Sequence, residues 1–286
     1  MTEKYSSLAS VSATRERLVE LGLSTKKSLG QHFLIDDGVV GKILRLAALE
    51  PGAKVLEVGP GIGTLTEALL SEQVDLTAVE LDSALHAGLS RYYPALKLIA
   101  GDALASETIA SLQALAPTVI VANLPYAVAA TIVLEYFQVL PSLKVATVMV
   151  QREVAERIAA EPSSKAYGAY TVKLGLLAKT VEQFGVSPQC FYPPPRVDSS
   201  VIRLERVRPY DELVATASML ADAAFFQRRK TIKNSMQAYF AAHDLNKDSV
   251  GELLAAAQID PTCRGETLSP EDFLNLASEL GEFPAV

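Results

Sequence analysis

Four consecutive residues, Asn123-Leu124-Pro125-Tyr126, have side chains and carbonyls suited to chemistry on an aromatic amine. An amine attached to a purine is a poor nucleophile because its lone pair is delocalised into the ring. The side-chain oxygen of Asn123 and the backbone carbonyl of Leu124 can accept its hydrogen bonds and orient the lone pair without a strong base. Tyr126 could stack on a base turned out of its helix. The alternative is a proline turn that caps a strand.

A glycine-rich turn, Glu57–Thr64 (EVGPGIGT), is the second candidate site. Gly59, Gly61 and Gly63 allow a sharp turn and a close approach to a ligand, and the helix that follows leaves amide donors free. The G-x-G-x-G spacing differs from the dinucleotide fingerprint G-x-G-x-x-G, and Pro60 lacks a donor that a pyrophosphate could use. Taken alone, the turn is as compatible with a tight loop as with a cofactor site.

Two carboxylates make a cofactor site more plausible. Glu80 ends the second predicted strand, where it could accept hydrogen bonds from both hydroxyls of a ribose, and Asp102 follows the third, where it could accept from an adenine amino group. The carboxyl ends of parallel strands share one edge of a sheet, so these side chains and the glycine turn should converge. They predict a cofactor that contains adenosine, and NAD stays open on these residues alone.

Alternating strand and helix patterns place these residues. The expected strands are Lys54–Val58, Leu76–Glu80, Leu96–Ala100, Thr118–Ala122 and Lys144–Val150, and the expected helices are Thr64–Ser71, Ser83–Tyr92, Glu107–Ala114, Ala129–Gln138 and Arg152–Ala160. This order predicts an α/β fold with a doubly wound, mainly parallel sheet. Two further β-like stretches, Thr171–Lys179 and Ser199–Arg206, suggest an antiparallel hairpin that closes the sheet.

The pattern changes near Pro209, after which only helices are expected, over Asp211–Phe226, Arg228–Ala241, Ser249–Ala257 and Pro270–Leu280. We therefore expect three parts: an N-terminal arm over 1–36 with one helix near Thr14–Leu21, a Rossmann-like domain over 37–207, and a small all-helical domain over 208–286.

Composition excludes several classes of protein. A hydrophobic fraction of 49% with 21% charged residues is that of an ordinary globular protein, and no apolar run is long enough to span a membrane. The N-terminus lacks the pattern of a signal peptide, which predicts a cytoplasmic protein, and the two separate cysteines do not suggest a zinc site. The net charge of −7 argues against a nucleic-acid partner, yet basic residues cluster at Arg228, Arg229, Lys230 and Lys233. Such a cluster is commonly only a solvated face.

Seven blocks together resemble the ribosomal RNA adenine N6-dimethyltransferase family, and specifically its small-subunit branch. The blocks occur in the family's order and extend over nearly the whole chain: Lys27–Leu34, Glu57–Thr66, Glu80, Asp102, Asn123–Tyr126 with Met149–Arg157, Phe191–Ser199, and Phe226–Asn234. His32 departs from the pattern because many relatives carry Asn there, which puts the polar contact at this position in doubt.

The resemblance implies a class I methyltransferase fold and dimethylation, by S-adenosylmethionine and without a metal, of two adjacent adenosines in the 3′-terminal hairpin of 16S rRNA in an immature small subunit. It implies that Asn123, Leu124, Pro125, Tyr126 and Phe191 are catalytic, with Phe191 near the target base, and that the basic block Arg228, Arg229, Lys230 and Lys233 binds RNA. It assigns the cofactor to Gln31, His32, Leu34, Glu57, Gly59, Gly61, Gly63, Glu80, Asp102, Ala103 and Asn123.

Three alternatives stay open on the sequence. The related enzymes that dimethylate 23S rRNA and confer macrolide resistance share most blocks, although the Phe191–Ser199 loop and the Arg228–Lys230 block favour the small-subunit branch. An NAD-dependent oxidoreductase is disfavoured by the glycine spacing and Pro60. A ribosome-assembly factor without catalysis is disfavoured by the intact Asn123–Tyr126 tetrapeptide. We expect the protein to act as a monomer, with no membrane partner.

Overall fold

The computed structural model of this 286-residue chain describes residues 4–23 and 32–282, which form two compact units. The first unit contains the residues up to Ala155 together with Thr180–Arg206, and the second contains Glu156–Lys179 and the chain from Val207. The division differs from the expected boundaries because residues 156–179 belong to the helical unit and the N-terminal arm belongs to the first. Within the described ranges, no helix is both long and apolar enough to cross a membrane.

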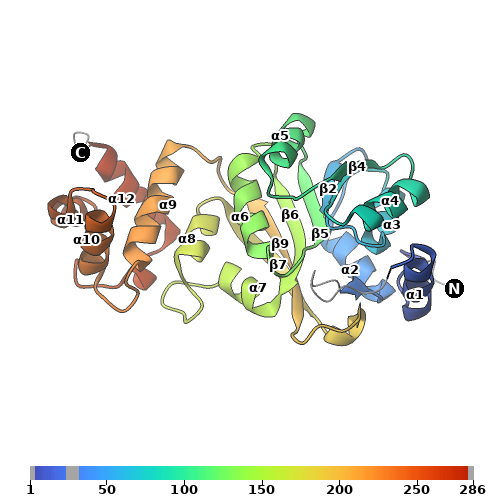
Figure 1. Cartoon of the computed structure of the whole chain (residues 1–286). Helices are drawn as coiled ribbons and strands as arrows, with labels where there is room; N and C mark the ends of the chain where they lie inside the picture. Colours follow the sequence, from blue (N-terminus) through green and yellow to red (C-terminus); the bar gives the residue numbers. More distant parts are fainter. Residues whose placement is uncertain (1–3, 24–31, 283–286) are drawn as a thin grey trace. The chain divides into compact units, whose positions relative to one another are not determined.

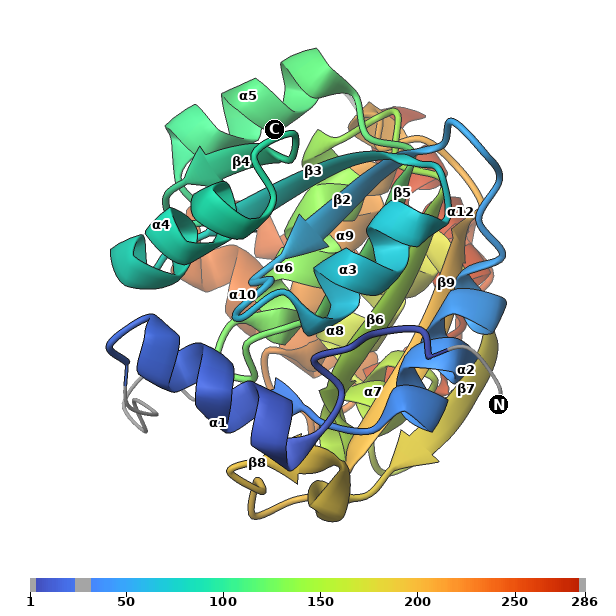
Figure 2. The same ribbon diagram turned by 90° about the vertical axis from the view of Figure 1, so that its right-hand side faces the viewer.

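The main sheet of the described residues has seven strands in the order β4-β3-β2-β5-β6-β9-β7 (Figures 1 and 2). Neighbouring strands from β4 to β6 pair in parallel, whereas β9 pairs antiparallel with β6. This is the predicted α/β sheet with a reversed strand beside it, and it brings the carboxyl ends of β2 to β6 to one edge. The bounds are β2 Lys54–Val58, β3 Asp75–Glu80, β4 Lys97–Ala100, β5 Val119–Asn123, β6 Val145–Gln151, β7 Ala178–Val186 and β9 Ser199–Arg206.

Helices cover both faces of this sheet. Figure 2 shows α2 and α3 in front of the strands and α6 behind them. Ile43 of α2 and Leu69 of α3 pack with Val121 and Met149 of β5 and β6 in one apolar cluster, and burying each such side chain contributes about 1.5–3 kcal/mol. The bounds are α2 Asp37–Ala47, α3 Thr64–Ser71, α4 Ser83–Tyr92, α5 Ser106–Leu115, α6 Ala129–Val139 and α7 Arg152–Ile158.

The N-terminal arm packs against the first unit through helix α1 (Val11–Glu20), whose start is capped by the Ser10 side chain. Before it, the hydroxyls of Ser6 and Ser7 each donate to the Glu67 carboxylate of α3 at 2.8 Å. Leu18 of α1 is buried in a second apolar cluster with Phe33, Ile62 and Leu85. Because Ile62 belongs to the glycine turn, α1 and the turn share a packed interface.

The second unit is helical, with α8 Ala169–Gly175, α9 Glu212–Phe225, α10 Ile232–Ala242, α11 Val250–Ala256 and α12 Pro270–Glu282. Its core contains the fully buried side chains of Leu220, Met236, Leu253 and Phe273. Asp211 caps α9 by accepting from the backbone N–H of Val214 at 2.9 Å. The expected all-helical character of this region therefore agrees with the structure.

Two expected elements are wrong. The strand expected over Thr171–Lys179 is largely helix α8, because Val172 and Leu174 are buried there against α9, and the strand β7 begins only at Ala178. The helix expected from Arg228 begins at Ile232, because the Thr231 side chain caps it by accepting the backbone N–H of Asn234. Tertiary packing outweighs local strand propensity in the first case, and a capping residue sets the start of the helix in the second.

Candidate functional site

The glycine turn follows β2 and opens α3 at the carboxyl edge of the sheet. Gly59, Gly61 and Gly63 have φ values of 68°, 60° and 93°, in the left-handed region that favours glycine. A Cβ atom at Gly63 would lie 2.8 Å from the Tyr93 ring, so only glycine fits there. The backbone N–H of Gly59 donates to the Val79 carbonyl of β3 at 2.9 Å, which fastens the turn to the neighbouring strand.

Glu80 and Asp102 lie at the carboxyl ends of β3 and β4, as predicted. Glu80 is 6% exposed, and its two oxygens accept from the backbone N–H groups of Gly61 at 3.1 Å and Asp82 at 2.9 Å. Each oxygen retains a lone pair for a ligand hydroxyl. Burial raises the pKa of the Glu80 carboxyl, and these backbone hydrogen bonds oppose that shift. Asp102 is exposed, with Oδ1 held by the N–H of Leu104 at 2.9 Å.

Glu57 lies in β2 beneath the turn. It is 2% exposed, and its carboxylate accepts from the Thr66 hydroxyl of α3 at 2.7 Å. Burial above all, with a smaller contribution from the nearby Glu80 carboxylate, raises the pKa of this carboxyl to about 8, and the hydrogen bond from Thr66 opposes the shift. A group so enclosed supports the turn by tying β2 to α3, and the direct cofactor contact expected for Glu57 stays a prediction.

The Asn123–Tyr126 tetrapeptide leaves β5 beside the glycine turn. The Asn123 side-chain Nδ2 donates to the His32 backbone carbonyl at 3.2 Å, which leaves the side-chain oxygen as an acceptor. A Cβ atom at Gly59 would lie 3.5 Å from the Pro125 ring, so the turn and the tetrapeptide are in close contact. The Leu124 N–H donates to the Met149 carbonyl of β6 at 3.1 Å, and this bond holds the start of the tetrapeptide on the sheet.

Tyr126 is held from two sides. Its hydroxyl is 2.5 Å from the Ser199 hydroxyl at the start of β9, and its ring stacks on the His32 ring with centroids 5.7 Å apart. Burial raises the pKa of the Tyr126 phenol, so the group stays neutral and is not a base. The role of Ser199 was not predicted, because no local signal links a strand-initial serine to a tyrosine 73 residues earlier in the chain.

The strand β1 (Phe33–Leu34) forms a wall beside the turn by pairing antiparallel with β8 (Phe191–Tyr192). A Cβ atom at Gly61 would lie 3.1 Å from the Phe33 ring. The His32 Nδ1 lies 2.7 Å from the Pro193 carbonyl, and since a carbonyl only accepts, Nδ1 is the donor. The His32 side chain, which stands where many relatives have Asn, therefore makes a hydrogen bond within the protein. Gln31, expected to contact the cofactor, lies outside the described residues.

Three residues expected in the site, Leu34, Ala103 and Phe191, are buried and pack within the protein. Phe191 is 2% exposed and belongs to the apolar cluster that contains Leu34, so its side chain is a core residue here. Ala103 is also buried, and its carbonyl accepts from the Tyr136 hydroxyl of α6 at 2.8 Å. The contact of Phe191 with a base, and those of Leu34 and Ala103 with a cofactor, stay predictions.

The N-terminal arm makes contacts around the glycine turn that were not predicted from the sequence. Arg17 donates to the Ile62 carbonyl of the glycine turn at 3.4 Å, and its guanidinium lies 3.6 Å from the centre of the Tyr92 ring. Leu21 approaches Gly88 of α4, where a Cβ atom would lie 2.5 Å from it. These contacts join segments distant in the chain, which only a structure or covariation could reveal.

The basic block lies in the second unit, and its four residues are not equivalent. Arg228 forms an ion pair with Glu266 at 3.2 Å and donates to the Lys165 carbonyl at 2.8 Å. Arg229, Lys230 and Lys233 are exposed, and their side chains make no hydrogen bond or ion pair with other residues that the structure describes. Arg228 is therefore engaged in holding the unit together, and the other three cations are available to a ligand.

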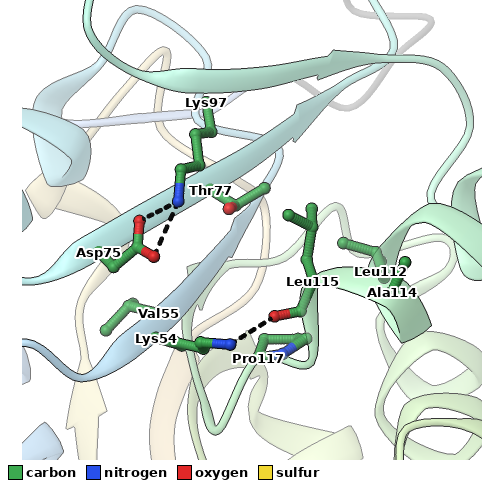
Figure 3. A pocket seen from close by; sticks show the side chains of 9 residues that line it. All are labelled: Lys54, Val55, Asp75, Thr77, Lys97, Leu112, Ala114, Leu115 and Pro117. Atoms are coloured by element: carbon green, nitrogen blue, oxygen red, sulfur yellow. Dashed lines mark hydrogen bonds and ion pairs between the residues drawn. The ribbon is translucent and has the colours of Figure 1, made fainter.

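A hollow of about 160 Å³ lies at the opposite edge of the sheet (Figure 3). Lys54, Asp75 and Lys97 stand at the amino ends of three parallel strands, and the Lys97 ammonium pairs with the Asp75 carboxylate at 2.6 Å. Ligands of open α/β sheets bind at the carboxyl ends. This hollow is therefore separate from the candidate site.

The model of a known family, described as ribosomal RNA adenine dimethylase, matches residues 22–280. The chain belongs to this family. It is 39% identical to a ribosomal RNA small subunit methyltransferase A of Thermobifida fusca over 97% of this chain and 99% of that protein. It is 41% identical to a protein of the same name from Mycobacterium bovis, over 92% of this chain and 85% of that protein.

Solved structures show the same fold. A dimethyladenosine transferase from Plasmodium falciparum superposes with a TM-score of 0.72 at 23% identity, covering 88% of this chain and 98% of that one. The 23S rRNA methyltransferase ErmE superposes with a TM-score of 0.61 at 24% identity, covering 87% of this chain and 100% of that one. The fold is thus that of class I rRNA methyltransferases, and the family makes the chain an rRNA adenine dimethyltransferase.

Replacing Glu57 by Gln should change how stability depends on pH. The folded-state pKa of about 8 lies above the ordinary value of 4.5, so between these pH values the folded protein keeps a proton that the unfolded chain has released. The stability of the wild type should fall as pH rises through this window, by up to about 1.4 kcal/mol per pH unit from this group. Denaturant unfolding of both proteins at pH 5, 6.5 and 8 would measure it. Parallel pH profiles would show that Glu57 is ionised in the fold.

Replacing Glu80 by Ala should weaken binding of S-adenosylmethionine about 10- to 150-fold, because a charge-assisted hydrogen bond contributes about 1.5–3 kcal/mol. The variant also leaves the Asp82 N–H without its acceptor, so calorimetric binding should be paired with a melting curve. Asp75→Ala, at the other end of the same strand, is the matched control and should bind normally. If the folded Glu80→Ala and Asp75→Ala variants bind S-adenosylmethionine equally well, Glu80 does not belong to the cofactor site.

Proposed function

We propose that this protein dimethylates N6 of two adjacent adenosines in the 3′-terminal hairpin of 16S rRNA with S-adenosylmethionine, during maturation of the small ribosomal subunit. The observation that carries the proposal is the Asn123 amide, held by the His32 carbonyl beside the glycine turn. This arrangement leaves an oxygen to accept a hydrogen bond from an amine at the carboxyl edge of the sheet. The relatives named small subunit methyltransferase A support the choice of rRNA.

The residues at this edge fit S-adenosylmethionine. The buried Glu80 carboxylate has acceptor capacity for ribose hydroxyls, and Asp102 Oδ2 is available to an adenine amine. The Thr64 hydroxyl at the start of α3 is buried without a hydrogen-bond partner among the described residues, which is what a polar ligand could satisfy. When bound, the cofactor supplies a methyl group on a sulfonium. Glu80, Asp102 and the glycine turn would position it.

The protein's part in methyl transfer is to orient the amine. The Asn123 oxygen and the Leu124 carbonyl would accept the two N–H groups of adenine N6 and so direct its lone pair along the line of displacement. Both groups also stabilise the positive charge that grows on the nitrogen in the transition state, and the methylated amine would then release its extra proton to water. Tyr126 is neutral and fastened to Ser199, so it would present a ring face to the base and would not remove a proton.

The helical unit would recognise the ribosomal substrate through Arg229, Lys230 and Lys233, whose charges are unpaired among the described residues. Local cations can bind phosphates even though the chain carries a net charge of −7. We further propose that the protein acts as a monomer in the cytoplasm. A macrolide susceptibility test would distinguish the 23S-directed alternative, which should raise resistance when the protein is expressed.

Replacing Asn123 by Ala should lower the single-turnover rate of methylation of immature small subunits about 100- to 1000-fold. The dissociation constants of cofactor and substrate should change little, because the hydrogen bond matters chiefly in the transition state. Asn275→Ala, which removes an Asn side chain that donates to the Ala257 carbonyl at 3.0 Å within the helical unit, serves as the matched control and should stay near the wild-type rate. If the Asn123→Ala variant methylates at the wild-type rate, the tetrapeptide is only a turn and the proposed role of Asn123 in catalysis is wrong. Nucleotide mapping of the product would identify the two adenosines.

Replacing Arg229 or Lys230 by Ala should weaken binding to immature subunits and reduce its dependence on salt. Each phosphate that the variant no longer neutralises lowers the slope of log affinity against log salt by up to about one unit. Arg228→Ala is the matched control, since its charge is committed to Glu266, and it should leave the slope unchanged. If only Arg228→Ala lowers the slope of log affinity against log salt, then Arg228 is the residue that contacts phosphate and the assignment to Arg229 and Lys230 is wrong.

A further inference from the structure

Three aromatic side chains meet between the end of α9 and the last turn of α10. The Phe226 ring lies edge-on to the Tyr239 ring, with centroids 5.6 Å apart, and 6.4 Å from the His243 ring. Tyr239 and His243, one helical turn apart at the end of α10, stack with centroids 3.9 Å apart and an interplanar angle of 24°. We call Phe226, Tyr239 and His243 the aromatic cluster.

The aromatic cluster is open to solvent. Phe226 is 50% exposed, and His243 is also exposed, so both present ring surface that folding has not covered. His243 is nevertheless held in place, because its Nδ1 lies 2.8 Å from the Tyr239 carbonyl and must donate to it. Nε2 then carries no proton in the neutral ring and can accept a hydrogen bond. The cluster is an oriented set of ring faces with a polar group at its rim.

Two cations, Arg229 and Lys230, follow Phe226 closely in the chain, and neither side chain pairs with another described residue. Phe226 leads into a turn closed by a bond from the Lys230 N–H to the Gln227 carbonyl at 2.9 Å, and this turn carries Arg229 and Lys230. The nearby carboxylate of Asp222 is neutralised by Lys173 at 2.6 Å. The exposed carboxylate of Asp244 follows His243 in the chain, and the two cations Arg229 and Lys230 outnumber it, so these residues together carry a net positive charge.

We propose that the aromatic cluster binds an unpaired nucleobase of the rRNA substrate by stacking, at a position other than the methylated adenosines. The inference rests on the proposed function and extends it to a second contact. Stacking of single-stranded bases on aromatic side chains, with cations along the backbone, is a common mode of RNA recognition. An apolar protein partner would leave Arg229 and Lys230 without counter-charges, whereas a nucleotide supplies both a ring and a phosphate.

Phe226→Leu tests the proposal because it keeps an apolar side chain and removes the aromatic face. Affinity for immature small subunits should fall about 5- to 150-fold, the range typical of removing one stacked base, while the salt slope stays at the wild-type value. Tyr210→Leu is the matched control, since Tyr210 is 41% exposed in the same unit and has no ring partner among the described residues. An unchanged affinity for Phe226→Leu, or a weaker affinity that comes with a lower salt slope, overturns the proposal.

A cross-linking experiment does not depend on the folding of that variant. p-Benzoylphenylalanine introduced at position 226 should form an adduct with rRNA when illuminated in complex with immature subunits. An adduct with a ribosomal protein instead overturns the proposal and identifies the other occupant. If the wild-type chain neither binds nor methylates the subunits, the proposed function fails and this inference fails with it. If the wild type does both and only the position-226 results are negative, the inference alone fails.

Discussion

The hydrogen bond from the Asn123 amide to the His32 carbonyl is the contact on which the rest of the site depends. An Asn side chain carries a donor end and an acceptor end, and either could face a ligand. The His32 carbonyl can only accept, so it takes the donor end and leaves the acceptor for an amine. The same bond joins the central strand β5 to the start of β1, and β1 contacts the glycine turn through Phe33. One interaction thus sets which end of the Asn123 amide is free and links β5 to the segment that packs against the glycine turn.

Burial sets the electrostatics of this edge. Glu57 and Glu80 lie under and beside the turn, and desolvation raises the pKa of both carboxyl groups. Backbone N–H groups compensate Glu80, whereas Glu57 has a single hydroxyl partner in Thr66. A Glu57 that keeps its proton therefore supports the turn without adding a second full negative charge beside Glu80, the carboxyl group that we propose accepts from the cofactor. The two carboxyl groups differ in their electrostatics because their hydrogen-bond partners differ.

The sequence predicted much of the secondary structure of the first unit closely, since β2, α3, α4 and β9 have the expected bounds. Strong apolar periodicity and short glycine-containing connections determine such elements locally. It failed at α8, where burial against α9 outweighed strand propensity, and at the start of α10, which the Thr231 cap sets. It also gave no sign of the ion pair between Arg228 and Glu266, which lie 38 residues apart. It predicted that Glu80, Asp102 and the glycine turn would converge, but not the contacts of Arg17, His32 or Ser199. Those depend on distances between remote segments, which a single sequence does not encode in any local pattern.

The short pairing of β1 with β8 has a consequence for how the protein folds. It and the adjoining bond from His32 to Pro193 join residues as much as 161 positions apart, far more than the neighbouring βα units of the sheet. Closing so long a loop costs entropy that only a nearly complete core repays, and contacts of this range are slow to form. The parallel strands can assemble first from local units. The pairing of β1 with β8 would then form last, so an incompletely folded chain would have the sheet without the strand that packs against the glycine turn.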